Sequence, residues 1–307
     1  MTKRKLENST LFCMALLLTL GFFLVFQNII STAIKDSLRL CYYTIIPSLF
    51  PFIILSDMIR STFTIPSNFL PSKLFSKLFF TTESGFFPFL MGAICGFPVG
   101  TREVTVLYKN QKITKKEAQH LLGFVNLASP AFTIFGVGVG LKNSLKEGIL
   151  LYLIQILSAL FVARLTSSKE KQNKYYISTA PASLPFPNIV MNASISMLTV
   201  CGMICIFSAF TSLFQHILPT YISVFATILL ELVNASKTIS IVFSSTPLAS
   251  FALTAFAISF GGFSVHMQAN LFISETDLSF WKYVFYKTIG AVFALILAFL
   301  CSFIFSI

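Results

Sequence analysis

Residues 86–108 read FFPFLMGAICGFPVGTREVTVLY, and this stretch decides how the rest of the chain is interpreted. The run is long and apolar enough to enter a bilayer, yet its middle contains Gly96, Pro98 and Gly100, followed by Arg102. Glycine and proline interrupt a helix, and backbone groups freed inside a membrane must line a cavity or contact other protein. We therefore predict a re-entrant helical hairpin here instead of a lipid-facing span.

The composition of the whole chain indicates an integral membrane protein. Of its 307 residues, 55% are hydrophobic and 11% are charged, whereas a soluble domain carries about 25% charged residues. The net charge of +11 lies in short loops between apolar runs. We interpret it as a topology signal and a contact with anionic lipid, with no role in binding nucleic acid.

Apolar runs of about 20 residues, the length that crosses the hydrocarbon core, recur along the chain. The candidates are 11–30, 38–59, 86–108, 119–141, 148–165, 188–215, 220–245, 247–273 and 283–306. Polar residues interrupt run 220–245, so we predict a second re-entrant hairpin there. The predicted fold is an all-α polytopic bundle with about seven full spans and two hairpins.

The basic residues suggest an orientation. If the N-terminus is cytoplasmic and each hairpin returns to the side it entered from, five of the 22 Lys and Arg residues lie outside: Lys35, Arg39, Lys142, Lys146 and Lys237. The other basic residues lie inside, as the positive-inside rule requires.

The same topology divides the chain into two units of opposite orientation. Residues 1–37 form an N-terminal span, 38–165 a first repeat, 166–187 a cytoplasmic linker and 188–307 a second repeat. Each repeat consists of a span, a hairpin and two further spans. Inverted repeats of this kind are typical of secondary transporters, whose substrate site lies at the midplane where the repeats meet.

The two predicted hairpins carry charged residues that could contact a ligand. A helix beginning near Thr101 would direct its N–H groups at an anion, and Arg102 would add a full charge. The alternative is a packing turn with Arg102 extended toward the headgroups. Glu231 in an apolar run is functional by default, as a proton carrier or cation ligand. Its alternative is a structural pair with Lys237.

The span that follows each hairpin is interrupted as well. Pro130 is expected to kink run 119–141, where Asn126 and Ser129 could bond either a substrate or freed carbonyl groups. In run 247–273, His266 could bind a ring or shuttle a proton, or belong to a kinked helix whose polar groups satisfy each other. The predicted substrate-binding residues are Gly96, Pro98, Gly100, Arg102, Asn126, Ser129, Glu231, Asn234, Lys237, Gly261, Gly262, Ser264, His266 and Gln268.

No catalytic or cofactor motif is present in the sequence. The six cysteines form no CxxC motif and no cluster with histidine, so neither a metal site nor a disulfide is predicted. The chain also lacks a phosphate-binding loop and the common hydrolase motifs. We predict no enzyme activity, no catalytic residues, no metal and no cofactor. Asp57 is predicted to be interfacial.

Several of these segments resemble one known family. The runs 96–100 (GFPVG), 113–118 (ITKKEA), 124–132 (FVNLASPAF) and 261–268 (GGFSVHMQ) resemble the YlbJ-type, stage V sporulation protein V-like, integral membrane proteins. That family carries two nucleoside recognition (gate) domains similar to the cores of concentrative nucleoside transporters. Ala235, where the family tends to have glycine, and the run 125–130 depart from its pattern.

The resemblance implies a place and a substrate. It implies the outer forespore membrane of a spore-forming Firmicute and export of dipicolinic acid during sporulation. We predict a secondary transporter or permease for this small aromatic anion. The alternatives are a nucleoside-like solute transporter and a non-transporting component of a sporulation complex. The expected partners are the small-molecule substrate and the lipid bilayer, and the chain is also compatible with a homo-oligomer.

Overall fold

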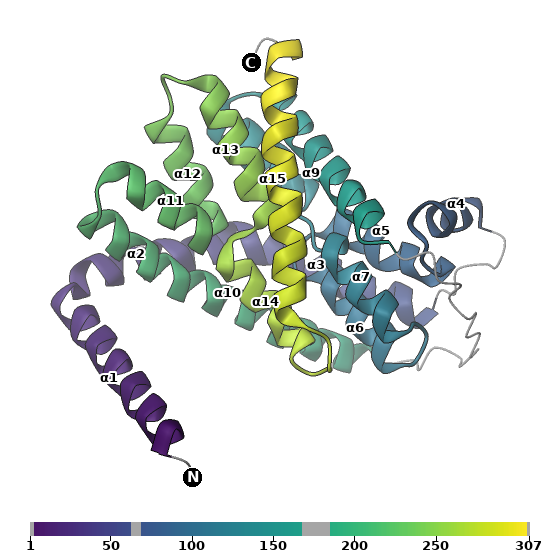
Figure 1. Ribbon diagram of the computed structural model, residues 1–307, viewed down its shortest axis with the longest axis horizontal. Coiled ribbons are helices and arrows are strands. Elements are labelled where there is room, and N and C mark those ends of the chain that lie inside the picture. Colours follow the sequence, from purple (N-terminus) through teal and green to yellow (C-terminus); the bar gives the residue numbers. More distant parts are fainter. Residues whose placement is uncertain (1–2, 63–68, 168–184, 306–307) are drawn as a thin grey trace.

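A computed structural model describes residues 3–62, 69–167 and 185–305 of the chain (Figure 1). The described part is helical and contains no strand. In chain order, its helices are α1 (Lys3–Val25), α2 (Gln27–Leu40), η1 (Cys41–Ile45), α3 (Ile46–Thr62), α4 (Leu70–Phe79), η2 (Glu83–Gly85), α5 (Phe86–Cys95), α6 (Val99–Lys109), α7 (Lys115–Val125), η3 (Ala131–Val139), α8 (Gly140–Lys142), α9 (Leu145–Leu165), α10 (Phe186–Ile217), α11 (Thr220–Leu230), α12 (Leu232–Val242), α13 (Pro247–Phe260), α14 (Gly262–Ile273) and α15 (Phe280–Phe305). Most of the predicted linker 166–187 lies outside the described residues.

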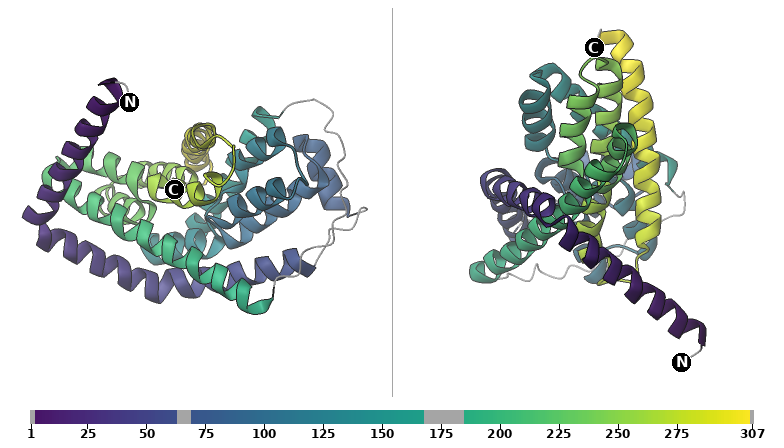
Figure 2. Two further views of the ribbon diagram at one scale, coloured as in Figure 1. Left: turned by 90° about the horizontal axis from the view of Figure 1, so that it is seen from below. Right: turned by 90° about the vertical axis from the view of Figure 1, so that its left-hand side faces the viewer.

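The first two predicted spans have different bounds in the structure. Helix α1 ends at Val25, and the chain turns by 87° before a helical run continues from Gln27 to Thr62 through α2, η1 and α3. The predicted span 11–30 is therefore wrong at its C-terminal end, because the bend at Phe26 divides it. Helix α1 projects away from the rest of the molecule (Figure 2).

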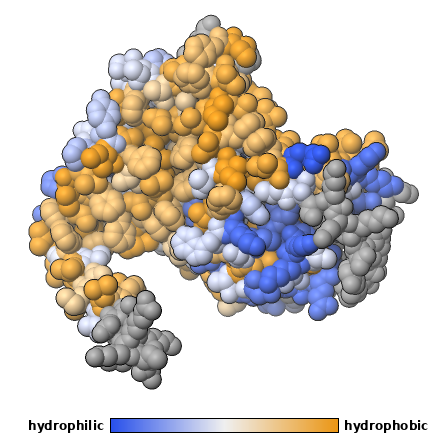
Figure 3. Space-filling model, viewed as in Figure 1, coloured by the Kyte–Doolittle hydropathy of each residue, from blue (hydrophilic) through white to orange (hydrophobic). Residues whose placement is uncertain are grey.

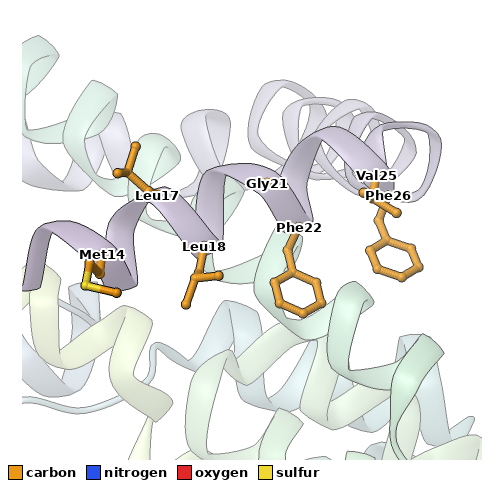
Figure 4. A pocket seen from close by; sticks show the side chains of 7 residues that line it. All are labelled: Met14, Leu17, Leu18, Gly21, Phe22, Val25 and Phe26. Carbon is orange, nitrogen blue, oxygen red and sulfur yellow. The ribbon is translucent and has the colours of Figure 1, made fainter. Parts of the chain in front are cut away.

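Helix α1 presents apolar side chains to its surroundings. Five apolar side chains that border an open groove along the helix are 50–77% exposed (Figure 4): Met14, Leu17, Leu18, Phe22 and Val25. Contiguous apolar exposure on this scale is unfavourable in water. It is the expected surface of a helix in contact with lipid.

Among the described residues, four helical segments are long and apolar enough to cross a membrane: α9, α10, α15 and the pair α13–α14, which covers Pro247–Ile273. The bent pairs Thr10–Val25 with Gln27–Ile45 and Leu70–Phe79 with Glu83–Cys95 raise the number to six if each pair is one span. The prediction of an all-helical membrane protein is confirmed, whereas the count of seven spans and two hairpins stays a prediction.

The arrangement of helices follows the same order in both halves of the chain. In the first half, the run α2–η1–α3 is followed by α4 and η2, which have no counterpart in the second half, and then by the adjacent pair α5–α6, the interrupted segment α7–η3–α8 and the helix α9. Helix α10 precedes the pair α11–α12, the interrupted segment α13–α14 and the straight helix α15. Helix α10 packs along α2 and α3. Helix α10 runs obliquely to the upright α15 (Figure 1).

Each of the four predicted interruptions is present. Helices α5 and α6 are separated by residues 96–98, α7 and η3 by 126–130, and α11 and α12 by Glu231. Helices α13 and α14 are separated at Gly261. Hydrophilic residues, by contrast, gather at the end of the molecule where α6, α7 and the loop before α15 lie (Figure 3).

Candidate substrate site at the helix breaks

The break between α5 and α6 packs against the break that follows α7. Gly96 has a positive φ of 85°, and a Cβ atom added there would lie 2.8 Å from the Cβ of Ser129. A Cβ at Gly100 would lie 2.2 Å from the carbonyl oxygen of Val125. Only glycine permits such approaches, so these glycines bring the two breaks of the first half together. The peptide bond between Phe97 and Pro98 is cis.

The two breaks of the second half meet in a similar way. The carboxylate of Glu231 accepts hydrogen bonds from the backbone N–H groups of Val233 at 3.0 Å and Asn234 at 2.7 Å. It therefore caps the N-terminus of α12. A Cβ at Gly262, where φ is 74°, would lie 3.1 Å from the backbone nitrogen of Glu231.

Contacts between the two halves join these pairs of breaks. A Cβ at Gly261 would lie 3.6 Å from the ring of Phe97, which belongs to the first break. Asn126 Nδ2 donates a hydrogen bond to the Tyr283 hydroxyl at 2.7 Å, and His266 Nδ1 lies 3.1 Å from the same hydroxyl. All four interruptions are thus connected through short contacts in the interior.

A lysine that the sequence reasoning did not select lies at this junction. Lys287 on α15 is 5% exposed, and its Nζ donates to the carbonyl oxygen of Asn126 at 2.8 Å. The ammonium group also lies 5.7 Å from the centre of the Phe97 ring, in cation–π range. Lys287 is the one charged residue of the predicted span 283–306, and that charge was the signal in the sequence that could have selected it, as a charge in an apolar run selected Glu231.

Helix α9 supplies polar groups to the same region. Gln155 accepts from the backbone N–H of Ala128 at 2.9 Å and donates to the carbonyl of Ala128 at 3.0 Å. These bonds satisfy the backbone that the break at 126–130 removes from a helix. A cavity of about 10 Å³ borders Gln155, Ser158, Ser259 and Lys287. Its volume is close to that of one water molecule.

Several polar atoms around the junction have no hydrogen-bond partner among the described residues. They are Asn126 Oδ1, Ser158 Oγ, Ser259 Oγ and His266 Nε2. An unsatisfied buried polar group costs about 1–3 kcal/mol, so a group of four is unusual for a packed interior. Such atoms are expected where a ligand or water binds.

This chain is similar to the sporulation integral membrane protein YlbJ of Bacillus subtilis (strain 168). The two are 24% identical over an alignment that covers 85% of this chain and 75% of YlbJ. The resemblance found in the sequence is therefore confirmed. No family model matches the chain. No solved structure matches it either.

The similarity to YlbJ, together with the apolar helices, makes this chain an integral membrane protein. It does not locate a site, so the role of each predicted residue depends on the geometry. The structure brings most of the predicted residues to the four breaks, but it gives several of them partners within the chain.

Arg102 is one of the residues with an internal partner. It forms two hydrogen bonds, at 2.8 and 2.7 Å, with the carboxylate of Asp57 on α3. Asp57 is 1% exposed, so it lies inside the protein, and its depth at the membrane interface stays a prediction. The pair has no local signature in the sequence, because Asp57 lies in an apolar run and 44 residues separate it from Arg102. The charge of Arg102 is balanced inside the protein.

The remaining predicted residues fall into two groups. Asn234 donates to Ser208 Oγ at 2.9 Å, and Gln268 lies 3.5 Å from Ser264 Oγ, so both contact neighbouring helical residues. Lys237 is exposed on α12, and no ion pair joins it to Glu231 in the described part of the chain. The structural Glu231–Lys237 pair considered above is therefore absent.

A second polar region joins the two halves at the hydrophilic end. Lys115 Nζ lies 2.7 Å from Asp277 Oδ2, the Tyr108 hydroxyl donates to Asp277 Oδ1 at 2.7 Å, and Lys109 pairs with Glu275. The hydrogen bonds from Lys115 and then Tyr108 hold the pKa of Asp277 below its ordinary value. The same contact with Asp277 raises the pKa of Tyr108.

Proposed function

We propose that this protein is a secondary transporter for a small aromatic anion, and that its substrate during sporulation is dipicolinate. The observation that carries the proposal is the meeting of four helix interruptions in the interior. Irregular backbone at membrane depth is tolerated where it is buried in protein or lines a cavity. Discontinuous helices of this kind form the midplane substrate sites of many secondary transporters.

The repeated order of helices supports an inverted-repeat transporter. We propose that residues 38–165 and 188–307 are two gate-like repeats of opposite orientation, with about seven full spans and two re-entrant hairpins. Residues 1–37 would add an N-terminal span, and 166–187 a cytoplasmic linker. Access would alternate as one repeat moves against the other around the breaks.

The small cavity beside Lys287 supports the proposal that the described arrangement is a closed state of the transporter. A volume of about 10 Å³ holds no more than about one water molecule and leaves no room for a dicarboxylate. Dipicolinate would enter when the two halves separate along their shared contacts. The closed form is the state expected between the outward-open and inward-open conformations.

Aromatic groups near the breaks suit a planar ligand. The rings of Phe260, Phe263 and Tyr283 lie 4.6, 5.8 and 5.3 Å from the ring of His266, centre to centre. Offset and edge-to-face aromatic contacts contribute about 0.5–1.5 kcal/mol beyond area burial. A flat pyridine ring could replace such contacts when the halves open.

The name of YlbJ supports a role in sporulation, and we extend that role to this chain. We place it in the outer forespore membrane with its N-terminus in the cytoplasm of the mother cell. A deletion strain should then accumulate dipicolinate in the mother cell and lack it in the spore.

Flux measurement in liposomes tests transport directly. Vesicles that contain the protein should release their dipicolinate faster than protein-free vesicles loaded in the same way. Uridine serves as the comparison solute. Glu231→Gln should abolish the flux, because the carboxamide carries no negative charge. The protein should remain in the membrane, because the carboxamide oxygen can still accept a hydrogen bond from the N-terminus of α12. No flux of either solute by the wild type would overturn the proposal and favour a non-transporting component.

Accessibility labelling tests the hairpin topology separately. Single cysteines at positions 80 and 111, the second at the exposed Gln111 just after α6, should be labelled from the same side of the membrane, because the α5–α6 hairpin returns to the side it enters from. Labelling from opposite sides would make residues 86–108 an ordinary span.

A further inference from the structure

Lys287 differs from the other buried cations of the described chain. Arg102 pairs with Asp57 at 2.7 Å, and Lys142, whose side chain is 7% exposed, pairs with Glu147 at 3.4 Å. Lys287 is 5% exposed, and no described carboxylate lies within 4 Å of its Nζ. An ammonium has three hydrogen-bond donors, and the structure uses one, toward Asn126.

A buried cation without a carboxylate is costly. Removing an ammonium from water carries a large desolvation penalty, which a nearby opposite charge normally offsets. Ionisable side chains inside a membrane protein that lack such a partner are associated with substrate or ion pathways. The environment of Lys287 is therefore best explained if a negative charge reaches it during the working cycle.

We infer that Lys287 Nζ binds a carboxylate of the transported anion. This inference rests on the proposed transport function and names the group that selects its substrate. Lys287 would hold one carboxylate by a charge-assisted hydrogen bond, and the Phe97 ring beside it would form part of the wall against the planar ring.

The cavity beside Lys287 provides a second, independent observation. Ser158 and Ser259 both line it, are 1% and 4% exposed, and carry hydroxyl groups without hydrogen-bond partners. Lys287 lines the same space, and the two hydroxyl groups and an ammonium are donors that match the acceptors of a carboxylate. Ser158 belongs to α9 in the first half, whereas Ser259 and Lys287 belong to the second half. Separation of the halves would therefore enlarge this space.

A structural role for Lys287 is the competing explanation. Its ammonium lies at the C-terminal end of α7, where the helix dipole favours a positive charge, and it satisfies the carbonyl of Asn126. A glutamine at position 287 could still donate a hydrogen bond to that carbonyl but would carry no charge. Lys287→Gln therefore separates the two roles.

The test is ligand binding to the full-length protein in detergent. The probes are pyridine-2,6-dicarboxylate and its uncharged analogue pyridine-2,6-dicarboxamide, with binding measured by calorimetry and by thermal stabilisation. We expect the wild type to prefer the dicarboxylate. We expect Lys287→Gln to raise the Kd of the dicarboxylate by about ten- to a hundredfold, the usual value of a hydrogen bond to a charged group. Lys142→Gln is the matched control and should leave that Kd within about threefold of wild type, because Lys142 already has a carboxylate partner.

Each outcome bears on one proposal. An unchanged Kd in Lys287→Gln overturns the carboxylate site and leaves transport in place. Selective dicarboxylate binding that is lost in Lys287→Gln, in a protein that moves no dipicolinate across liposomes, supports the site and overturns transport. If Lys287→Gln does not fold, the wild type decides alone, since equal Kd values for the two probes would overturn the carboxylate site.

Discussion

The two halves of this protein meet at two polar regions whose chemistry differs. The loop-side cluster is exposed and consists of complementary charges, with Lys109 opposite Glu275 and Lys115 opposite Asp277. The junction at the helix breaks is buried and consists of amide, phenol and imidazole groups around Lys287. Lys109 and Lys115 have carboxylate partners although water screens their charges. Lys287 has none among the described residues, although the desolvation penalty of its charge is larger.

This difference in charge balance indicates which of the two regions binds a ligand. Exposed ion pairs contribute little and are readily replaced by water, so the loop-side cluster is suited to opening and closing. A buried region with an unbalanced cation and unsatisfied hydroxyl groups is incomplete by itself. An anionic ligand would complete it, and the loop-side cluster would control whether the halves can separate to admit that ligand.

The largest expected effect on stability concerns the buried pair Arg102–Asp57, in which a buried cation has a carboxylate partner. Removing one partner leaves the other charge buried, so Asp57→Asn should lower the free energy of unfolding by about 3–5 kcal/mol. Equilibrium unfolding in mixed micelles measures this. The double variant Asp57→Leu with Arg102→Met should recover most of the loss. A loss below about 1 kcal/mol in Asp57→Asn would show that burial here does not make an unpaired charge costly.

A smaller effect is expected from the close backbone contacts that bring the breaks together. A Cβ at Gly100 would lie 2.2 Å from the Val125 carbonyl oxygen, so Gly100→Ala should cost about 1–3 kcal/mol through overpacking. Gly202→Ala is the matched control, because a Cβ there meets nothing within 4 Å, and it should not destabilise the protein. Equal thermal stability of the two variants would contradict the packing described at the junction.

The smallest effect is expected at the loop-side cluster. The pKa of Asp277 is lowered by Lys115 and Tyr108, so its stabilising contribution is complete above the ordinary carboxylate pKa. That contribution is lost as the pH falls through the lowered value. Lys115→Ala should remove part of the pH dependence of Tm on the acid side, and high salt should weaken the wild-type effect. An identical pH profile for wild type and variant would show that the cluster does not hold the halves together.

The sequence predicted the breaks better than it predicted the junction they form. Glycine, proline and Glu231 inside apolar runs interrupt helices for local reasons, so their positions were accessible without a structure. The pairing of Arg102 with Asp57 joins two different helices and has no local signature. Tyr283 and Lys287 lie on α15, which is apolar enough to span a membrane, and the charge of Lys287 is its one local signal. Their burial results from packing against α7 and α9, which periodicity does not reveal.

The bend after α1 was missed for a similar reason. Residues 22–30 contain neither glycine nor proline, and the run 11–30 is apolar except for Thr19, Gln27 and Asn28. Tertiary contacts decide the direction of the chain there, including the contact between Phe26 and His216 at 5.6 Å, ring centre to centre.

The most direct test that the helix breaks form the substrate site is whether dipicolinate protects a single cysteine placed at their junction from labelling. Ser259→Cys, in a protein whose six native cysteines are replaced by alanine, would be reacted in liposomes with a membrane-impermeant methanethiosulfonate. We expect the cysteine to react slowly from water, and dipicolinate, but not its dicarboxamide, to reduce the rate severalfold. Labelling that dipicolinate leaves unchanged, in a protein that still transports it, would show that the helix breaks do not form the substrate site.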